Sequence, residues 1–274
     1  SIGLFWINIA EADLRIMCGC PADSVKYLIK TGLIAPIEKD GVRFETGPNA
    51  ILLSDVMLQN GHFSNLSEFP ILHMLYKQGH IIPNHPNNFT HKPLLIGTEA
   101  QIQAQMKYLY RGNYGLISKA EIMECGIDEE WADIMMSIKL NFAFGEIKKS
   151  EEIIDTLTLE YEKIEIRKGV FIKHLGLNQF EISYQDEQVS VDLNLGNQVY
   201  ESPYFLGYHQ IKREYFGVIH SGGGNGWDQN RPCMSSILMF QGRFYLLDAG
   251  PNILYSLTAL GIGINEIGGV FHTH

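Results

Sequence analysis

Leu246-Leu247-Asp248-Ala249-Gly250 and, further along, Val270-Phe271-His272-Thr273-His274 give the clearest indication of the fold. Each stretch is a short apolar run of strand length that ends in polar, chemically active side chains. Residues 253–260 between them have the spacing of a short helix, and Gly261 follows as a helix stop. These patterns predict a strand, a helix and a second, buried strand in this order.

The residues before this region extend the β pattern. Residues 216–219 read as a strand, and Gly222 to Gly226 form a glycine-rich loop. The sequence Arg231-Pro232-Cys233-Met234-Ser235-Ser236 then leads into residues 236–240 and 244–247, which predict a hairpin around Gln241-Gly242.

Taken together, these segments resemble the opening half of a metallo-β-lactamase-fold hydrolase, a superfamily built as an αββα sandwich. The glycine loop and the Arg-Pro-Cys-Ser stretch look most like its phosphodiesterase-type members, which include tRNA-processing endonucleases and cyclic-nucleotide phosphodiesterases. The resemblance implies that Asp248 supports a metal site from behind, that Thr273 matches the motif's threonine and that His274 is its first metal ligand. In an alternative register, His272 and His274 are the leading histidine pair.

The same resemblance implies the cofactor and the substrate class. Two divalent metal ions, zinc first with manganese or iron as alternatives, would activate a water for hydrolysis of a small-molecule or nucleotide phosphodiester. The substrate phosphate would contact residues of the glycine loop and its neighbours, namely Gly223, Gly224, Asn225, Asp228 and Arg231.

The chain stops after one ligand of this motif, and the water-orienting aspartate of the family would follow His274. The catalytic residues therefore stay unknown, and we expect the chain alone to be inactive and to be a fragment of the hydrolase. The missing half of the sandwich, on the same or a separate chain, would be its partner. A homodimer is also compatible with the sequence.

The first half of the chain has a different pattern, in which apolar runs alternate with helical spacing. Three strand-like runs are each followed by a helix, with the strands at 14–18, 50–53 and 93–96 and the helices at 22–31, 67–78 and 99–110. This alternation predicts a parallel α/β layer.

Ligands of open α/β sheets bind beyond the carboxyl ends of the strands. Cys20, Asp23 and Asp55 lie at such ends and predict a possible ligand pocket. Ordinary turn and cap chemistry explains these residue types equally well. Cys18 and Cys20 are spaced more closely than a zinc knuckle requires, so reduced thiols are the favoured interpretation.

The division into domains follows the change of pattern. Residues 118–145 are helical, a charged stretch at 146–152 follows, and alternating β patterns begin at 164. We therefore predict an α/β plus helical domain at 1–148, of unknown role, and the first half of the metallo-β-lactamase-like domain at 149–274. The fold class expected for the whole chain is α/β and α+β.

Composition narrows the function classes. The 31 acidic residues outnumber the 21 basic ones, which excludes a generally basic nucleic-acid surface. Four cysteines in 274 residues are too few for a disulfide scaffold, and the lack of a long apolar run argues against a membrane span, so we expect a cytoplasmic protein. Two other functions stay open: a non-catalytic ligand-binding or sensor protein that uses the N-terminal domain, and a natural half-domain completed by another chain.

Overall fold

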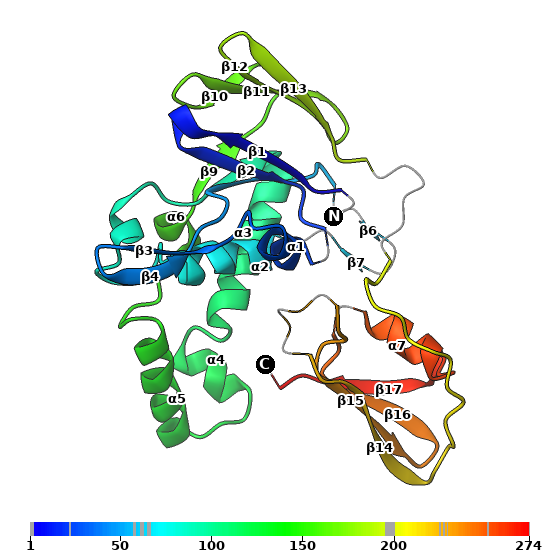
Figure 1. The fold of residues 1–274 in the computed structure, drawn as a ribbon. Coiled ribbons are helices and arrows are strands. Elements are labelled where there is room, and N and C mark those ends of the chain that lie inside the picture. The colour runs from blue at the N-terminus through cyan, green and yellow to red at the C-terminus, as the bar shows by residue number, and fades with distance from the viewer. Residues whose placement is uncertain are drawn as a thin grey trace. The chain divides into compact units, whose positions relative to one another are not determined.

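The computed structural model has a mixed α/β fold made of two compact units (Figure 1). Unit 1 contains residues 3–58 and 65–196, and unit 2 contains residues 59–64 and 197–274. The structure describes residues 3–21, 23–56, 59–60, 63–64, 67–194, 201–224, 226, 228, 230–250 and 252–273.

A five-stranded sheet is the centre of unit 1. Its strands, in spatial order, are β1 (Phe5–Ile9), β2 (Leu14–Cys18), β5 (Ala50–Leu52), β8 (Leu94–Gly97) and β9 (Asp155–Thr158). The last four are parallel to one another, and β1 is antiparallel to β2. The three strands predicted from apolar runs are therefore confirmed, and β1 and β9 add an edge strand on each side.

Helices follow the strands as the periodicity predicts. The helical elements of unit 1 are η1 (Ala10–Ala12), α1 (Ser24–Lys30), α2 (Glu68–Leu72), η2 (His73–Lys77), η3 (Pro86–Phe89), α3 (Glu99–Tyr114), α4 (Lys119–Glu124), α5 (Glu129–Phe142) and α6 (Ser150–Ile153). The helix predicted at 67–78 is one α-helical segment that continues into a π-helical turn, η2. Ser118 caps α4, since its hydroxyl oxygen accepts the backbone N–H of Glu121. None of the described helices is long and apolar enough to span a bilayer.

A second, antiparallel sheet packs against the first. It consists of β10 (Ile164–Arg167), β11 (Val170–Gly176), β12 (Gln179–Tyr184) and β13 (Glu187–Asp192) in sequential order. Two short hairpins are also present. One, in unit 1, pairs β3 (Pro36–Lys39) with β4 (Val42–Glu45), and the other, in unit 2, pairs β6 (Gln59–Asn60) with β7 (Phe63–Ser64).

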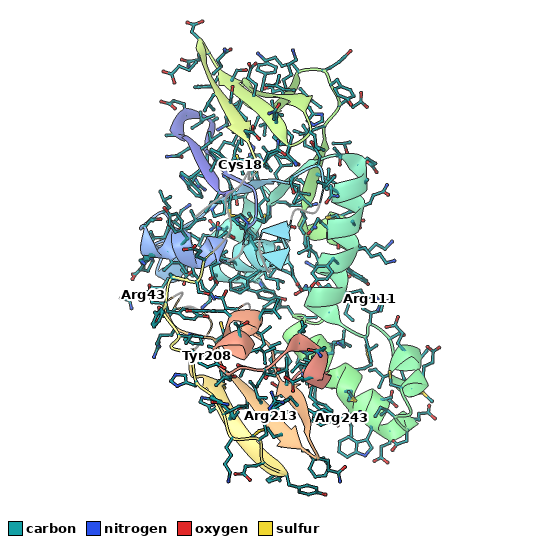
Figure 2. All side chains as sticks on the ribbon, turned by 90° about the vertical axis from the view of Figure 1, so that its right-hand side faces the viewer. Cys18, Arg43, Arg111, Tyr208, Arg213 and Arg243 are labelled. Atoms are coloured by element: carbon teal, nitrogen blue, oxygen red, sulfur yellow. The ribbon has the colours of Figure 1, made fainter. Side chains whose placement is uncertain are left out.

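The central strands are buried on both faces, which explains why they read as continuous apolar runs. Successive side chains of a strand point to opposite faces. Met17 and Ile51 therefore join a core with α1, α2 and α3, whereas Leu52 and Ile96 join a second core with β11 and β12. Cys18, labelled in Figure 2, lies in this second core, between the sheets.

The boundary between the units differs from the one predicted after residue 148. Strand β9 hydrogen-bonds to β8, with Asp155 opposite Leu94, and the β10–β13 sheet shares a core with the same layer. Residues 149–194 therefore belong to unit 1, and the division falls after residue 196. The charged stretch at 146–152 leads into α6 rather than out of the domain.

The described residues of unit 2 form a four-stranded sheet, two helical elements and the β6–β7 hairpin. The strands of the sheet are β14 (Phe216–Gly222), β15 (Ser235–Phe240), β16 (Arg243–Leu247) and β17 (Ile267–Phe271) in sequential order, and α7 (Ile253–Ala259) and η4 (Ile264–Glu266) connect the last two. The first three strands are antiparallel, and β17 is parallel to β16. Arg213, labelled in Figure 2, forms an ion pair with Glu266 in this unit.

Candidate functional site

The segment after β17 is held by Asp248, which follows β16. The Oδ1 atom of Asp248 accepts the backbone N–H of Thr273 at 2.8 Å, and Oδ2 accepts the Thr273 hydroxyl at 2.6 Å. Leu247 and Phe271 are partners in the parallel pair, so the two strands deliver both residues to the same end of the sheet. Asp248 has a left-handed backbone (φ 59°), and its own N–H donates to the Phe271 carbonyl. The carboxylate thus fixes the chain around Thr273.

The predicted metal ligands flank this anchored threonine. His272 is exposed at the end of β17, and His274 lies outside the described residues. Both oxygens of Asp248 already accept hydrogen bonds from Thr273. Across the part of the chain that the structure describes, no three His, Cys, Asp or Glu side chains are grouped closely enough to hold a metal ion. These residues alone therefore do not fit a metal centre.

The glycine loop packs against its own chain. A Cβ atom on Gly222 would lie 2.0 Å from the Cys233 carbonyl oxygen, and one on Gly224 would lie 2.6 Å from the Pro232 carbonyl oxygen. Gly224 and Pro232 are joined by a 2.8 Å backbone hydrogen bond. Two glycines are therefore explained by backbone packing, whereas Gly223 is left without a close neighbour, and the predicted Asn225 lies outside the described residues.

The two predicted phosphate contacts, Asp228 and Arg231, bind each other. The Arg231 Nε donates to Asp228 Oδ2 at 3.0 Å, and the backbone N–H of Asn230 donates to Asp228 Oδ1 at 2.9 Å. The Asn230 amide, with a smaller contribution from Arg231, lowers the pKa of the Asp228 carboxyl. The pair is at the surface, where Arg231 keeps further guanidinium N–H groups for an anion.

The N-terminal candidates are buried and engaged. Cys20 is almost fully buried, and burial raises the pKa of its thiol, so the thiol stays protonated at neutral pH and is a poor metal ligand. Asp23 precedes α1 and forms a 2.7 Å ion pair with Lys26, with both side chains largely buried. The structure therefore gives Asp23 a partner within its own helix.

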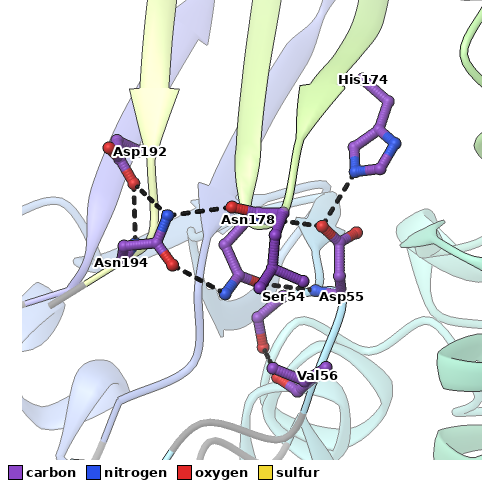
Figure 3. A network of polar contacts seen from close by, with 8 residues as sticks. Ser54, Asp55, Val56, His174, Asn178, Asp192 and Asn194 are labelled. Atoms are coloured by element: carbon purple, nitrogen blue, oxygen red, sulfur yellow. Dashed lines mark hydrogen bonds and ion pairs between the residues drawn. The ribbon is translucent and has the colours of Figure 1, made fainter.

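Asp55 connects the two sheets of unit 1 (Figure 3). Its Oδ2 accepts from His174 Nε2 at 2.8 Å and from the Asn178 N–H, and its own N–H donates to Asn178 Oδ1 at 2.8 Å. The side chains of Asp55 and His174 are only 8% and 10% exposed, and the imidazole lies near the rings of Tyr161 and Phe180. These hydrogen bonds cross-link the two layers, and the other carboxylate oxygen, Oδ1, is buried without a hydrogen-bond partner.

The sheet of unit 2 has apolar side chains on both faces. The face of its sheet that carries Ile237 and Leu246 is buried against Leu257 of α7. The strand pairing places four exposed, apolar residues together on the opposite face: Phe216, Val218, Phe240 and Phe271. The sequence signal for this second face is that Phe216 and Val218 of β14, two residues apart and so on the same side of the strand, are both large and apolar.

Comparison of the chain with protein-family models, with curated proteins and with solved structures finds no match. Any functional interpretation therefore has to rest on the residues themselves.

Proposed function

We propose that unit 2 is the first half of a metallo-β-lactamase-type sandwich that acts in metal-dependent hydrolysis of phosphodiesters. The observation that carries this proposal is the double hydrogen bond from Thr273 to Asp248. It anchors the chain between two histidines at the end of a parallel strand pair, which is where the resemblance expects the metal-binding segment to begin.

The uncovered face of the sheet in unit 2 supports the proposed partner, which is the missing half of the sandwich. Soluble domains rarely expose contiguous apolar patches, and a sheet that is apolar on both faces needs a layer on each. Helix α7 covers the face that carries Ile237, and the opposite face, with Val218 and Phe271, is open. We propose that the second sheet of the sandwich covers it, on the same or another chain.

The metal ions belong to the proposal as well. A catalytic zinc ion takes three protein ligands, and the described residues offer His272 beside an already engaged Asp248. We therefore propose that the two metal ions bind only where further donors complete the site. Cytoplasmic location is part of the same proposal, and it is supported by the cysteine content, because four cysteines in 274 residues are too few for a disulfide scaffold.

The test uses the polypeptide encoded by the complete gene. Its zinc, manganese and iron content is measured together with hydrolysis of bis(4-nitrophenyl) phosphate. We expect bound metal and hydrolysis, both strongly reduced in Asp248→Ala and His274→Ala. His91→Ala, which changes an exposed loop histidine of unit 1, serves as the matched control and should keep both. A metal-free, inactive wild type would refute the proposal, and so would an Asp248→Ala variant with unchanged metal content.

A further inference from the structure

A groove of about 470 Å³ lies between α3, α4 and α5 in unit 1, within the size range of small-molecule sites. Its walls are mainly apolar, formed by Leu116, Ile122, Met135, Ile138, Phe142 and Ala143. The apolar residues of α5 have helical spacing, yet Ala132 is the one described residue of this helix that is buried. Phe142 is 77% exposed at the groove.

Buried hydrogen-bond donors line the same groove. The Tyr76 hydroxyl donates to Asn113 Oδ1 at 2.7 Å, which leaves the amide Nδ2 of Asn113 buried without a hydrogen-bond partner. The hydroxyl of Tyr114 is also buried, and two nearby donors, the Lys148 backbone N–H and the Asn113 side chain, lie outside the geometry of a normal hydrogen bond. Burial above all raises the pKa of Tyr114, so its hydroxyl keeps its proton and can donate. A buried donor without a partner costs free energy, which a ligand acceptor would recover.

The groove also has a cationic side chain, Lys139. The Lys139 ammonium donates to the Tyr114 carbonyl and has two further N–H groups. None of the described residues that line the groove is acidic. Glu121, whose pKa is lowered mainly by Arg111 and to a smaller degree by Lys139, is already bound to the Arg111 guanidinium by two 3.0 Å hydrogen bonds.

We propose that this groove binds a soluble amphipathic carboxylate with a single alkyl chain. The carboxylate would accept from Asn113 Nδ2, Tyr114 and Lys139, and the chain would lie along the apolar wall of α5. A neutral or cationic headgroup would leave these donors without an anionic acceptor. This site lies wholly in unit 1 and is independent of the proposed hydrolase function of unit 2.

The test is calorimetric titration of the purified chain with decanoate, decanol and decyltrimethylammonium as separate ligands. We expect decanoate to bind with a stoichiometry of one and at least about tenfold more tightly than the other two, which corresponds to about 1.4 kcal/mol. Asn113→Asp keeps the acceptor for Tyr76 and adds a negative charge, and should weaken decanoate binding about tenfold or more.

Asn141→Asp is the matched control, because it makes the same change on an exposed residue of α5 that does not line the groove. It should leave the affinity for decanoate unchanged. Lys139→Met is the second variant and should weaken decanoate but not decanol. Circular dichroism of each variant shows whether unit 1 is folded. Equal affinities for the three ligands, absence of decanoate binding to the wild type, or equal effects of Asn113→Asp and Asn141→Asp would each overturn the proposal.

Discussion

Replacement of Asp55 by alanine should destabilise unit 1 strongly, because its carboxylate is the acceptor for two buried donors. Without it, the His174 Nε2 and the N–H of the fully buried Asn178 lose their partner. An unmatched buried donor costs about 1–3 kcal/mol. Breaking a buried pair by removal of one partner costs about 3–5 kcal/mol. Two such donors together cost about 2–6 kcal/mol, a range that includes the value for a broken pair, so we expect the free energy of unfolding to fall by about 3–5 kcal/mol.

Urea unfolding followed by circular dichroism measures this loss, with the slope m checked for constancy. Glu160→Ala is the matched control, since it removes an exposed carboxylate from a loop of the same unit and should change the free energy of unfolding by less than about 0.5 kcal/mol. The reasoning fails if Asp55→Ala and Glu160→Ala unfold at the same urea concentration. That result would return Asp55 to the predicted role in a ligand pocket, where its removal need not affect the stability of the ligand-free protein.

Two further predictions concern unit 2. Gly222→Ala should destabilise it by about 1–3 kcal/mol, because the new Cβ meets the Cys233 carbonyl. Gly223→Ala is the control and should change the free energy of unfolding by less than about 0.5 kcal/mol. Equal shifts of the melting temperature in the two variants would contradict the packing argument. An NMR titration should give Glu266 a pKa of about 2, lowered chiefly by Arg213, and Arg213→Met should raise that pKa towards the ordinary value. Because the pKa of Glu266 is lower in the folded state, the ion pair stabilises the fold at pH values above the ordinary glutamate pKa, and this contribution is lost as the pH falls towards 2. An unchanged Glu266 pKa in Arg213→Met would refute the assignment.

The elements that the sequence predicts well are those with a strong local signal. Strands β5 and β8 are buried on both faces, so their residues are apolar without interruption. Helix α3 keeps Ile102, Met106 and Leu109 on one face towards the core. In these segments the burial that stabilises the element also produces the pattern that predicts it.

Strand β9 shows why the unit boundary could not be predicted. Its exposed residues Asp155 and Thr156 give no apolar run, and it is a strand because its backbone pairs with β8, some sixty residues earlier in the chain. The charged stretch before it has the composition of a linker, yet Ser150 of α6 is buried and its hydroxyl donates to the Met106 carbonyl. Composition reports exposure along the chain, whereas a boundary depends on which distant strands pair.

The two aspartates at strand ends show the same limit for the candidate sites. Asp55 and Asp248 each follow a central strand, and the sequence predicts a functional position for both. The lone pairs of Asp248 are taken by Thr273, which the parallel crossover from β16 to β17 brings back to it, so the motif is visible along the chain. Oδ2 of Asp55 accepts from His174 and Asn178 of another sheet, a pairing that no local pattern reveals, and Oδ1 is buried without a hydrogen-bond partner. The position of an acid at a strand end is thus predictable from sequence, but its role is set by the partner that the fold supplies: a buried link to a second sheet for Asp55, and a histidine-bearing segment for Asp248.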